Sequence, residues 1–251
     1  MTAPVAGADE ALIRVFIGFD PREEAAFHVL ARSIHERASK PVAVTPLALS
    51  QLGGLMWRDR HQLQSTDFSF SRFLTPYLAG YQGWAVFMDC DMLVLDDIAN
   101  LWKLRDDRYA VMVVKHDHQP TETTKFLNQP QTRYEKKNWS SVMLFNTARC
   151  RALTPEYVNS ASGLELHQFK WLDSDNDIGD LPRQWNHLVD YYPHDDKASL
   201  VHYTTGGPYF EEYADCDYAS EWTRERDAML FVDQAAKSEA DAEKRRKEAK
   251  G

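Results

Sequence analysis

Two carboxylates, Asp89 and Asp91, interrupt an apolar run of this 251-residue chain, GWAVFMDCDMLVLDD. A buried carboxylate without a partner is unfavourable because it loses its hydration, so these acids need solvent, a partner or a cation. If residues 84–88 form a strand, successive side chains alternate between its faces, and both acids point to the same side. Two carboxylates at a strand end suit a hard divalent cation. The alternative is that they only cap the next turn.

A distant histidine is a candidate third ligand. His202 follows the apolar pair Leu200-Val201, so we expect it at the end of another strand. Ligands of open α/β sheets bind beyond the carboxyl ends of the strands, where such side chains converge. A lone histidine is more often a satisfied core or surface residue, so the residues alone leave the role of His202 open.

The elements that must position these side chains alternate between strands and helices. Strand patterns cover residues 13–19, 42–49, 84–88, 109–115 and 141–146. Helical spacing covers residues 22–37, 69–79, 98–104 and 214–235, with a break expected near Pro76. This alternation predicts an α/β fold whose central, mainly parallel sheet is flanked by helices.

The chain is predicted to form one domain with two appendages. Hydrophobic residues make up 43% of the chain, which is enough for a core, and length fits one large domain. We expect a disordered N-terminus at residues 1–10, a single catalytic domain at residues 11–235 and a charged tail at residues 236–251. The tail is charged on all sides, which favours a solvated helix or disorder.

Composition argues against several classes of protein. The formal net charge of −9 opposes general binding to nucleic acid. The three cysteines show no zinc-site spacing and indicate reduced thiols of a cytoplasmic protein. The N-terminus lacks signal-peptide features, and no apolar run reaches the roughly 20 residues that span a bilayer. The basic run at residues 244–247 permits only weak peripheral contact with an anionic membrane.

Residues 71–102 resemble the core block of family-8, glycogenin-like glycosyltransferases. The block carries an Arg before the strand, here Arg72, then the apolar strand, the DxD motif Asp89-Cys90-Asp91, and Leu101-Trp102. Four further segments resemble family motifs in the expected order: FIGFDPRE, SVMLFN, LPRQWN and VHYTTGGPYF. The resemblance covers about residues 13–213. A DxD alone is weakly specific, whereas five blocks in order are strongly specific.

The resemblance implies a GT-A fold and a nucleotide-diphosphate sugar as the donor, with uridine as the family's usual base. It implies that Asp89, Asp91 and His202 are the metal ligands. Oxygen ligands with one imidazole suit Mn²⁺, with Mg²⁺ next. A cation that holds both phosphates would stabilise the charge that develops on the leaving diphosphate. An acidic protein could thereby bind an acidic donor.

The donor contacts implied by the resemblance begin at the first strand. Phe19 and Asp20 would meet the nucleoside, and the alternative for Asp20 is a plain turn with helix capping. Arg72 would approach the diphosphate or orient an Asp of the DxD motif, and its alternative is a surface salt bridge.

The chain departs from the family pattern at three places. Gln168 falls where the family has an Asp-Gln pair facing the transferred sugar, but His167 replaces the Asp. The family has Asn-Ala-Gly before the VML strand, where this chain has Trp-Ser-Ser at residues 139–141. Asn138 or Ser140 would replace the sugar contact of that segment. The family's late Lys is absent, and the N–H groups of the glycine pair at residues 206–207 would cradle phosphate instead. A tight turn is the alternative for Gly206 and Gly207.

The mechanism implied by the resemblance is transfer with retention of anomeric configuration. A double displacement would need a carboxylate beneath the anomeric carbon, and no residue can be named for it. We therefore favour front-face displacement, with Asp89 and Asp91 holding the metal and Gln168 at the sugar. The acceptor would be a hydroxyl of a glycan, a glycolipid, a small molecule or a protein.

Two other functions compete with this interpretation. A nucleotidyltransferase shares the sheet topology and the use of metal, but it usually carries a Gly-rich loop after the first strand, and FIGFDPREE has one glycine. A non-catalytic nucleotide-sugar-binding module would keep the fold, but the complete set of Asp89, Asp91 and His202 argues against it.

Overall fold

A six-stranded sheet forms the centre of the molecule. The structure, a computed structural model, describes residues 12–60, 64–117, 124, 125, 127, 129, 130 and 135–231. In order across the sheet the strands are β2 (Val42–Leu47), β1 (Ile13–Gly18), β3 (Trp84–Met88), β8 (Val142–Asn146), β5 (Val111–Val113) and β9 (Ile178–Asp180). Three neighbouring pairs are parallel, and only β8 runs against its neighbours β3 and β5. The predicted mainly parallel sheet is therefore confirmed.

A second sheet explains why two acids lie within the apolar run. It contains β10 (His187–Leu188), β11 (Leu200–His202) and β4 (Met92–Val94), with β10 and β11 parallel and β4 antiparallel to β11. The chain therefore leaves the first sheet at Met88 and enters the second at Met92. Asp89 and Asp91 lie at this junction, where both sheets end. The apolar stretch is two short strands rather than one.

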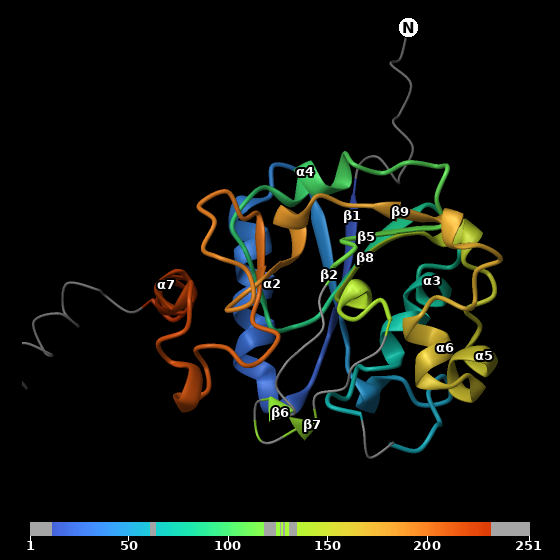
Figure 1. Cartoon of the computed structure of the whole chain (residues 1–251), viewed down its shortest axis with the longest axis horizontal. Coiled ribbons are helices and arrows are strands. Elements are labelled where there is room, and N and C mark those ends of the chain that lie inside the picture. The colour runs from blue at the N-terminus through green and yellow to red at the C-terminus, as the bar shows by residue number, and fades with distance from the viewer. Residues whose placement is uncertain are drawn as a thin grey trace, which may run out of the picture.

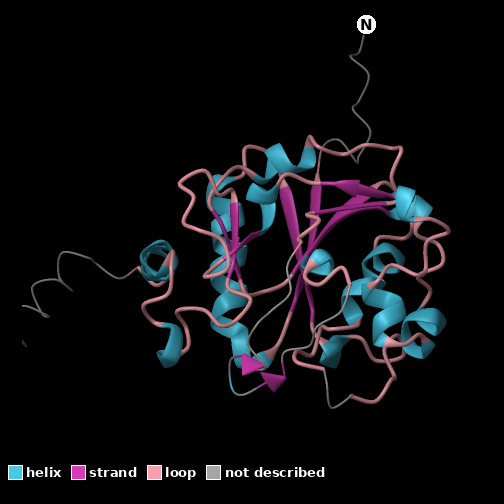
Figure 2. Cartoon of the chain, viewed as in Figure 1, coloured by secondary structure: helices cyan, strands magenta, loops and turns pink. Residues whose placement is uncertain are grey.

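Helices lie on both sides of the main sheet, as Figures 1 and 2 show. In Figure 1, α2 and α7 are on the left of the sheet, and α3, α5 and α6 are on the right. The α-helices are α2 (Glu24–Arg37), α3 (Thr75–Leu78), α4 (Ile98–Trp102), α5 (Pro155–Ser160), α6 (Gly163–His167) and α7 (Ala219–Met229). Short 3-10 helices are η1 (Pro21–Glu23), η2 (Leu49–Gln51), η3 (Ser71–Leu74), η5 (Trp139–Ser141), η6 (Thr147–Arg149), η7 (Asp175–Asp177), η8 (Arg183–Asn186) and η9 (Glu211–Tyr213). A two-stranded ribbon, β6 (Thr124–Lys125) with β7 (Gln129–Pro130), completes the described elements.

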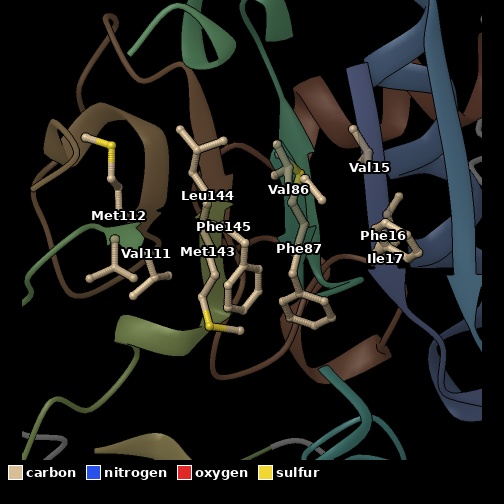
Figure 3. Packing of buried hydrophobic residues seen from close by; sticks show 14 of the residues in the cluster. Val15, Phe16, Ile17, Val86, Phe87, Val111, Met112, Met143, Leu144 and Phe145 are labelled. Carbon is tan, nitrogen blue, oxygen red and sulfur yellow. The ribbon is translucent and has the colours of Figure 1, made fainter. Parts of the chain in front are cut away.

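The core accounts for the apolar runs of the sequence. Every residue of β3 and β8 is buried, as expected for strands that are covered on both faces. Figure 3 shows Leu144 on the opposite side of the sheet from Met143 and Phe145, so β8 contributes to the packing on both faces. Cross-strand partners share a face, and Phe87 pairs with Met143.

Two predicted helices differ from the structure. The helix predicted for residues 69–79 is divided into η3 and α3, and the division precedes Thr75. Pro76 lies in the first turn of α3, where its missing N–H breaks no helical hydrogen bond. The helix predicted for residues 214–235 is shorter in the described part of the chain, because Tyr218 has a left-handed φ of 57° immediately before α7.

The predicted appendages fall outside the described residues. These are residues 1–10 and the tail at residues 236–251, so the predicted domain limits stay predictions. Within the part of the chain that the structure describes, no helix combines the length and apolar character that crossing a bilayer requires.

Candidate metal and donor site

The structure brings together the three predicted metal ligands. Asp89, Asp91 and His202 each offer one ligand atom, and these atoms all lie within 4.8 Å of one another. Asp91 and His202 are buried, and Nε2 of His202 is 3.4 Å from Oδ1 of Asp91. Two carboxylates and one imidazole are a donor set that fits a divalent metal ion.

Backbone pairing between the two sheets positions these ligands. The N–H of Asp89 donates to the carbonyl of Ser141 at 2.9 Å, which continues the pairing of β3 with β8. The carbonyl of Asp91 accepts from the N–H of Tyr203 at 2.9 Å, which extends the pairing of β4 with β11. His202 is the last residue of β11, as predicted. The ligands are therefore held by sheet hydrogen bonds rather than by a long loop.

Arg72 holds Asp89 from the protein interior. Its guanidinium Nη1 is 2.7 Å from Oδ1 of Asp89 and donates to the carbonyl of Ser140 at 2.9 Å. The guanidinium lies 5.3 Å from the ring centre of Phe68 and 5.1 Å from that of Phe87, within cation–π range. Arg72 is only 6% exposed, so the surface salt bridge considered above is wrong. The pairing orients one acid of the DxD motif, and a direct contact of Arg72 with the diphosphate stays a prediction.

Asp20 caps η1 in the structure. Its carboxylate accepts from the backbone N–H and the side chain of Arg22 and from the backbone N–H of Asp67. Burial alone would raise the pKa of Asp20, but these hydrogen bonds outweigh it and the pKa is lowered. The neighbouring Phe19 packs edge-on against Phe27 with ring centres 5.4 Å apart. The capping alternative thus describes the local geometry, and nucleoside contacts by Phe19 and Asp20 stay predictions.

The turn before β8 contains Asn138 and Ser140. Asn138 adopts a left-handed φ of 65°, and its buried Nδ2 has no hydrogen-bond partner among the described residues. The hydroxyl of Ser140 is 2.7 Å from Nδ1 of His167, and the Ser140 carbonyl accepts from Arg72. The polar groups of Ser140 therefore bond within the protein, whereas the amide nitrogen of Asn138 has no partner in the part of the chain that the structure describes.

Gln168 is the C-cap residue of α6 and follows its last residue, His167. It is half-buried, and its backbone carbonyl accepts from Nζ of Lys136 at 3.0 Å. His167 packs its ring edge-on against Phe73, with ring centres 5.2 Å apart. Ser140 thus links α6 to Arg72 and the acid pair. The sugar-facing role of Gln168 stays a prediction.

The two glycines allow close packing of tyrosine rings. The N–H of Gly206 donates to the carbonyl of Tyr203 at 3.0 Å, as the tight-turn alternative expects. A Cβ at Gly206 would lie 2.3 Å from the ring of Tyr213, and one at Gly207 would lie 2.4 Å from the ring of Tyr209. Phosphate binding by their N–H groups stays a prediction.

Sequence reasoning missed the contact between Glu23 and Tyr209. Glu23, the last residue of η1 directly before α2, is 1% exposed, and its Oε1 accepts from the Tyr209 hydroxyl at 2.9 Å. Burial, together with the negative charges of Glu23 and Asp91, raises the pKa of Tyr209 well above its usual value, so the hydroxyl keeps its proton. The hydrogen bond thus connects the loop after His202 to the end of η1, directly before α2. Glu23 lies in the segment FIGFDPRE and Tyr209 in the segment VHYTTGGPYF, but no sequence pattern indicates that the two side chains meet.

The buried surroundings of His167 predict a pH-dependent stability. Burial, and then the nearby Arg72 charge, hold the pKa of His167 well below 6.5. Between pH 6.5 and that lowered pKa, the unfolded chain binds a proton that the folded chain does not. The free energy of unfolding is therefore unaffected by this group above about pH 6.5. Below that pH it decreases by at most about 1.4 kcal/mol per pH unit. Urea unfolding at pH 7.5 and 5.5 should show that the free energy of unfolding decreases less in His167→Gln than in the wild type between these two pH values. An equal loss in both proteins would contradict this.

No model of a known protein family matches the sequence. Protein CDI of Arabidopsis thaliana is 48% identical over 237 residues, which cover 91% of this chain and 90% of that protein.

Three solved glycosyltransferases share the fold. The bifunctional glycosyltransferase WbbM has a TM-score of 0.63 and 14% identity over 88% of this chain and 50% of that one. GlyE of Streptococcus pneumoniae TIGR4 has a TM-score of 0.59 and 11% identity over 86% of this chain and 60% of that one. The galactosyltransferase LgtC, in complex with donor and acceptor sugar analogues, has a TM-score of 0.53 and 14% identity over 86% of this chain and 96% of that one. The chain thus spans about half the length of WbbM and 60% of GlyE.

At such low identity these similarities concern the fold. They confirm the predicted GT-A fold, while membership of family 8 stays a prediction. The high identity over nearly the whole length of both chains shows the family: this GT-A-fold protein belongs to the family of Protein CDI of Arabidopsis thaliana.

Proposed function

We propose that this protein is a metal-dependent glycosyltransferase that moves a sugar from a nucleotide-diphosphate donor to a hydroxyl acceptor with retention of configuration. The observation that carries the proposal is the convergence of Asp89, Asp91 and His202 at the junction of two sheets in a GT-A fold. We further propose uridine as the donor base.

The donor set favours Mn²⁺, with Mg²⁺ as the second choice. Two carboxylates suit either hard cation, and the imidazole of His202 favours Mn²⁺. When bound there, a divalent cation would neutralise the charge that develops on the leaving diphosphate. The buried Arg72 holds Asp89 in place, so this ligand need not be reorganised when the cation enters.

The remaining donor contacts are assigned by which polar groups stay available. Asn138 is a better candidate for the sugar contact than Ser140, because the Nδ2 group of Asn138 is unpaired within the described residues while Ser140 already bonds to His167. Gln168 lies one residue beyond His167 and would face the transferred sugar. Phe19 and Asp20 would meet the nucleoside, and the glycine pair at residues 206–207 would approach the diphosphate.

The proposal includes the organisation and surroundings of the protein. Residues 11–235 would form the single catalytic domain of a cytoplasmic enzyme, and a glycan, a glycolipid, a small molecule or a protein would supply the acceptor hydroxyl. A front-face reaction would let the departing phosphate accept the proton of that hydroxyl, since no described carboxylate is assigned beneath the sugar.

The test is a screen of nucleotide sugars with Mn²⁺, followed by detection of the released nucleoside diphosphate. Release that depends on Mn²⁺ and stops with chelator is expected, because water can replace the acceptor. Pyrophosphate as the product would indicate a nucleotidyltransferase instead. Tight donor binding in a thermal-shift assay without any turnover would indicate a binding module.

A further inference from the structure

We propose that Asn186 is a positioning residue for the metal ligand His202, held in one orientation by a hydrogen-bonded relay through Ser141 to the backbone of Asn138. The inference rests on the metal site of the proposed function and assigns a residue outside the ligand set. Asn186 ends η8 and is 0% exposed, and His202 is 2% exposed.

The amide of Asn186 faces the ring of His202. Its Oδ1 lies 3.0 Å from Nδ1 of His202, which is the ring nitrogen remote from the acid cluster. The other nitrogen, Nε2, is the one that lies 3.4 Å from Oδ1 of Asp91. Asn186 therefore contacts the ligand without being a ligand.

The orientation of the amide follows from its other neighbours. Nδ2 of Asn186 lies 3.4 Å from the carbonyl oxygen of Asn138 and 2.8 Å from Oγ of Ser141. A carbonyl oxygen can only accept, so the nitrogen of the amide must be on this side. The Ser141 hydroxyl donates its single proton to the Asn138 carbonyl at 2.7 Å, so Oγ is left to accept from Nδ2. The oxygen of the amide must then face His202.

The amide in turn determines the tautomer of His202. Because Oδ1 can only accept, Nδ1 of His202 must carry a proton. A neutral ring protonated at Nδ1 presents its lone pair at Nε2, on the side of Asp91. A lone pair beside a carboxylate is the arrangement that a shared cation requires, and outer partners of this kind orient ligating histidines and raise their basicity.

The relay also connects the metal ligand to the donor side of the site. Asn138 has a φ of 65°, and in this conformation its carbonyl accepts from both the N–H and the hydroxyl of Ser141. Three segments therefore share one buried network: the end of β11, the end of η8 and the turn before β8. A fully satisfied buried network holds its members in one arrangement, whereas truncating one member leaves the others without partners.

The experiment measures the affinity of the full chain for Mn²⁺ alone, by electron paramagnetic resonance. Asn186→Ala should weaken Mn²⁺ binding by about 10- to 100-fold, the range for loss of an outer-shell partner. Asn186→Asp keeps an acceptor for Nδ1 but loses the N–H donor to Ser141 and Asn138, so it should bind Mn²⁺ more tightly than Asn186→Ala. Ser141→Ala keeps the amide but frees its orientation, and a smaller loss is expected.

The matched control is Gln184→Ala. Gln184 lies on the same 3-10 helix, is exposed, and bonds to Ser199 rather than to the site. This variant should bind Mn²⁺ as the wild type does. Circular dichroism of each variant separates loss of the site from loss of the fold.

A second measurement needs no metal. The ¹⁵N shifts of His202 in the metal-free wild type should report a ring protonated at Nδ1, and Asn186→Ala should show a mixture of tautomers. Protonation at Nε2 alone in the wild type, or unchanged Mn²⁺ affinity in Asn186→Ala, would overturn the positioning role.

The Asp91→Ala variant distinguishes failure of this role from failure of the metal site. If Asp91→Ala abolishes Mn²⁺ binding while Asn186→Ala leaves it unchanged, only the role of Asn186 is wrong. If Asp91→Ala also binds Mn²⁺ normally, the metal site itself is wrong, and the ¹⁵N shifts still decide whether Asn186 sets the tautomer.

Discussion

Asp91→Ala or His202→Ala should reduce Mn²⁺-dependent release of nucleoside diphosphate by at least about 10³-fold. Each change removes one of three convergent ligand atoms, and a bound cation supplies several kcal/mol of stabilisation to developing charge. Removing Asp91 also removes a buried negative charge beside Asp89, so the fold should remain intact without metal. The measurement is the initial rate of donor hydrolysis as a function of Mn²⁺ concentration.

Volume-conserving variants and remote controls make this result specific. Asp91→Asn and His202→Gln keep the packing and should lose nearly as much activity as the alanine variants. Asp215→Asn and His35→Ala remove the same residue types at exposed positions and should retain the wild-type rate. If the alanine variants turn over donor at the full rate and chelator is also harmless, the assignment of the metal site is wrong.

Gln168→Ala should slow transfer by about 10²- to 10³-fold while donor binding weakens much less. This is the loss expected when one positioned polar group that acts on the transition state is removed. An amide is a poor nucleophile, but its oxygen can stabilise positive charge on the sugar ring, so its effect should be on kcat rather than on KM. Steady-state rates and donor affinity, measured separately, distinguish these two effects.

The stereochemical outcome tests the same prediction independently. We expect NMR of the first product to show retained anomeric configuration, and we expect mass spectrometry to find no covalent sugar on either the wild type or Gln168→Ala. Lys170→Ala, two residues away on the exposed surface, serves as the control and should be normal. An inverted product would refute both front-face displacement and the family-8 interpretation, and it would require a general base among the residues near the acceptor.

The acids of the apolar run lie where two sheets meet. Strand β3 pairs with β8 in the main sheet, and β4 pairs with β11 in the second. A carboxylate placed there gains the rigidity of strand ends without being enclosed in a strand interior, and Arg72 compensates one of the two charges. This geometry explains how two carboxylates can stand between the buried apolar residues of β3 and β4 in the sequence.

The amino-acid sequence by itself indicated five of the six strands of the main sheet and the chemistry of the ligands, but it did not indicate β9, α5 or α6. The strand pattern at residues 84–88 coincides with β3, and residues 13–19, 42–49 and 141–146 differ from β1, β2 and β8 only at their ends. His202 was expected at a strand end and lies at one. Such features depend on side-chain periodicity and on the apolar character of neighbouring residues, which are local properties.

Only the tertiary structure decided which distant residues meet. Asn186 and His202 are 16 positions apart, and Asn186 and Ser141 are 45 apart, yet their side chains form one relay. No spacing rule predicts such a relay, because it depends on how η8, β11 and the turn before β8 pack around shared buried polar groups. The same holds for Arg72, whose pairing with Asp89 requires η3 to lie against β3. Local patterns encode the period and the buried face of each element, whereas contacts between elements follow from filling a common core and satisfying every polar group inside it.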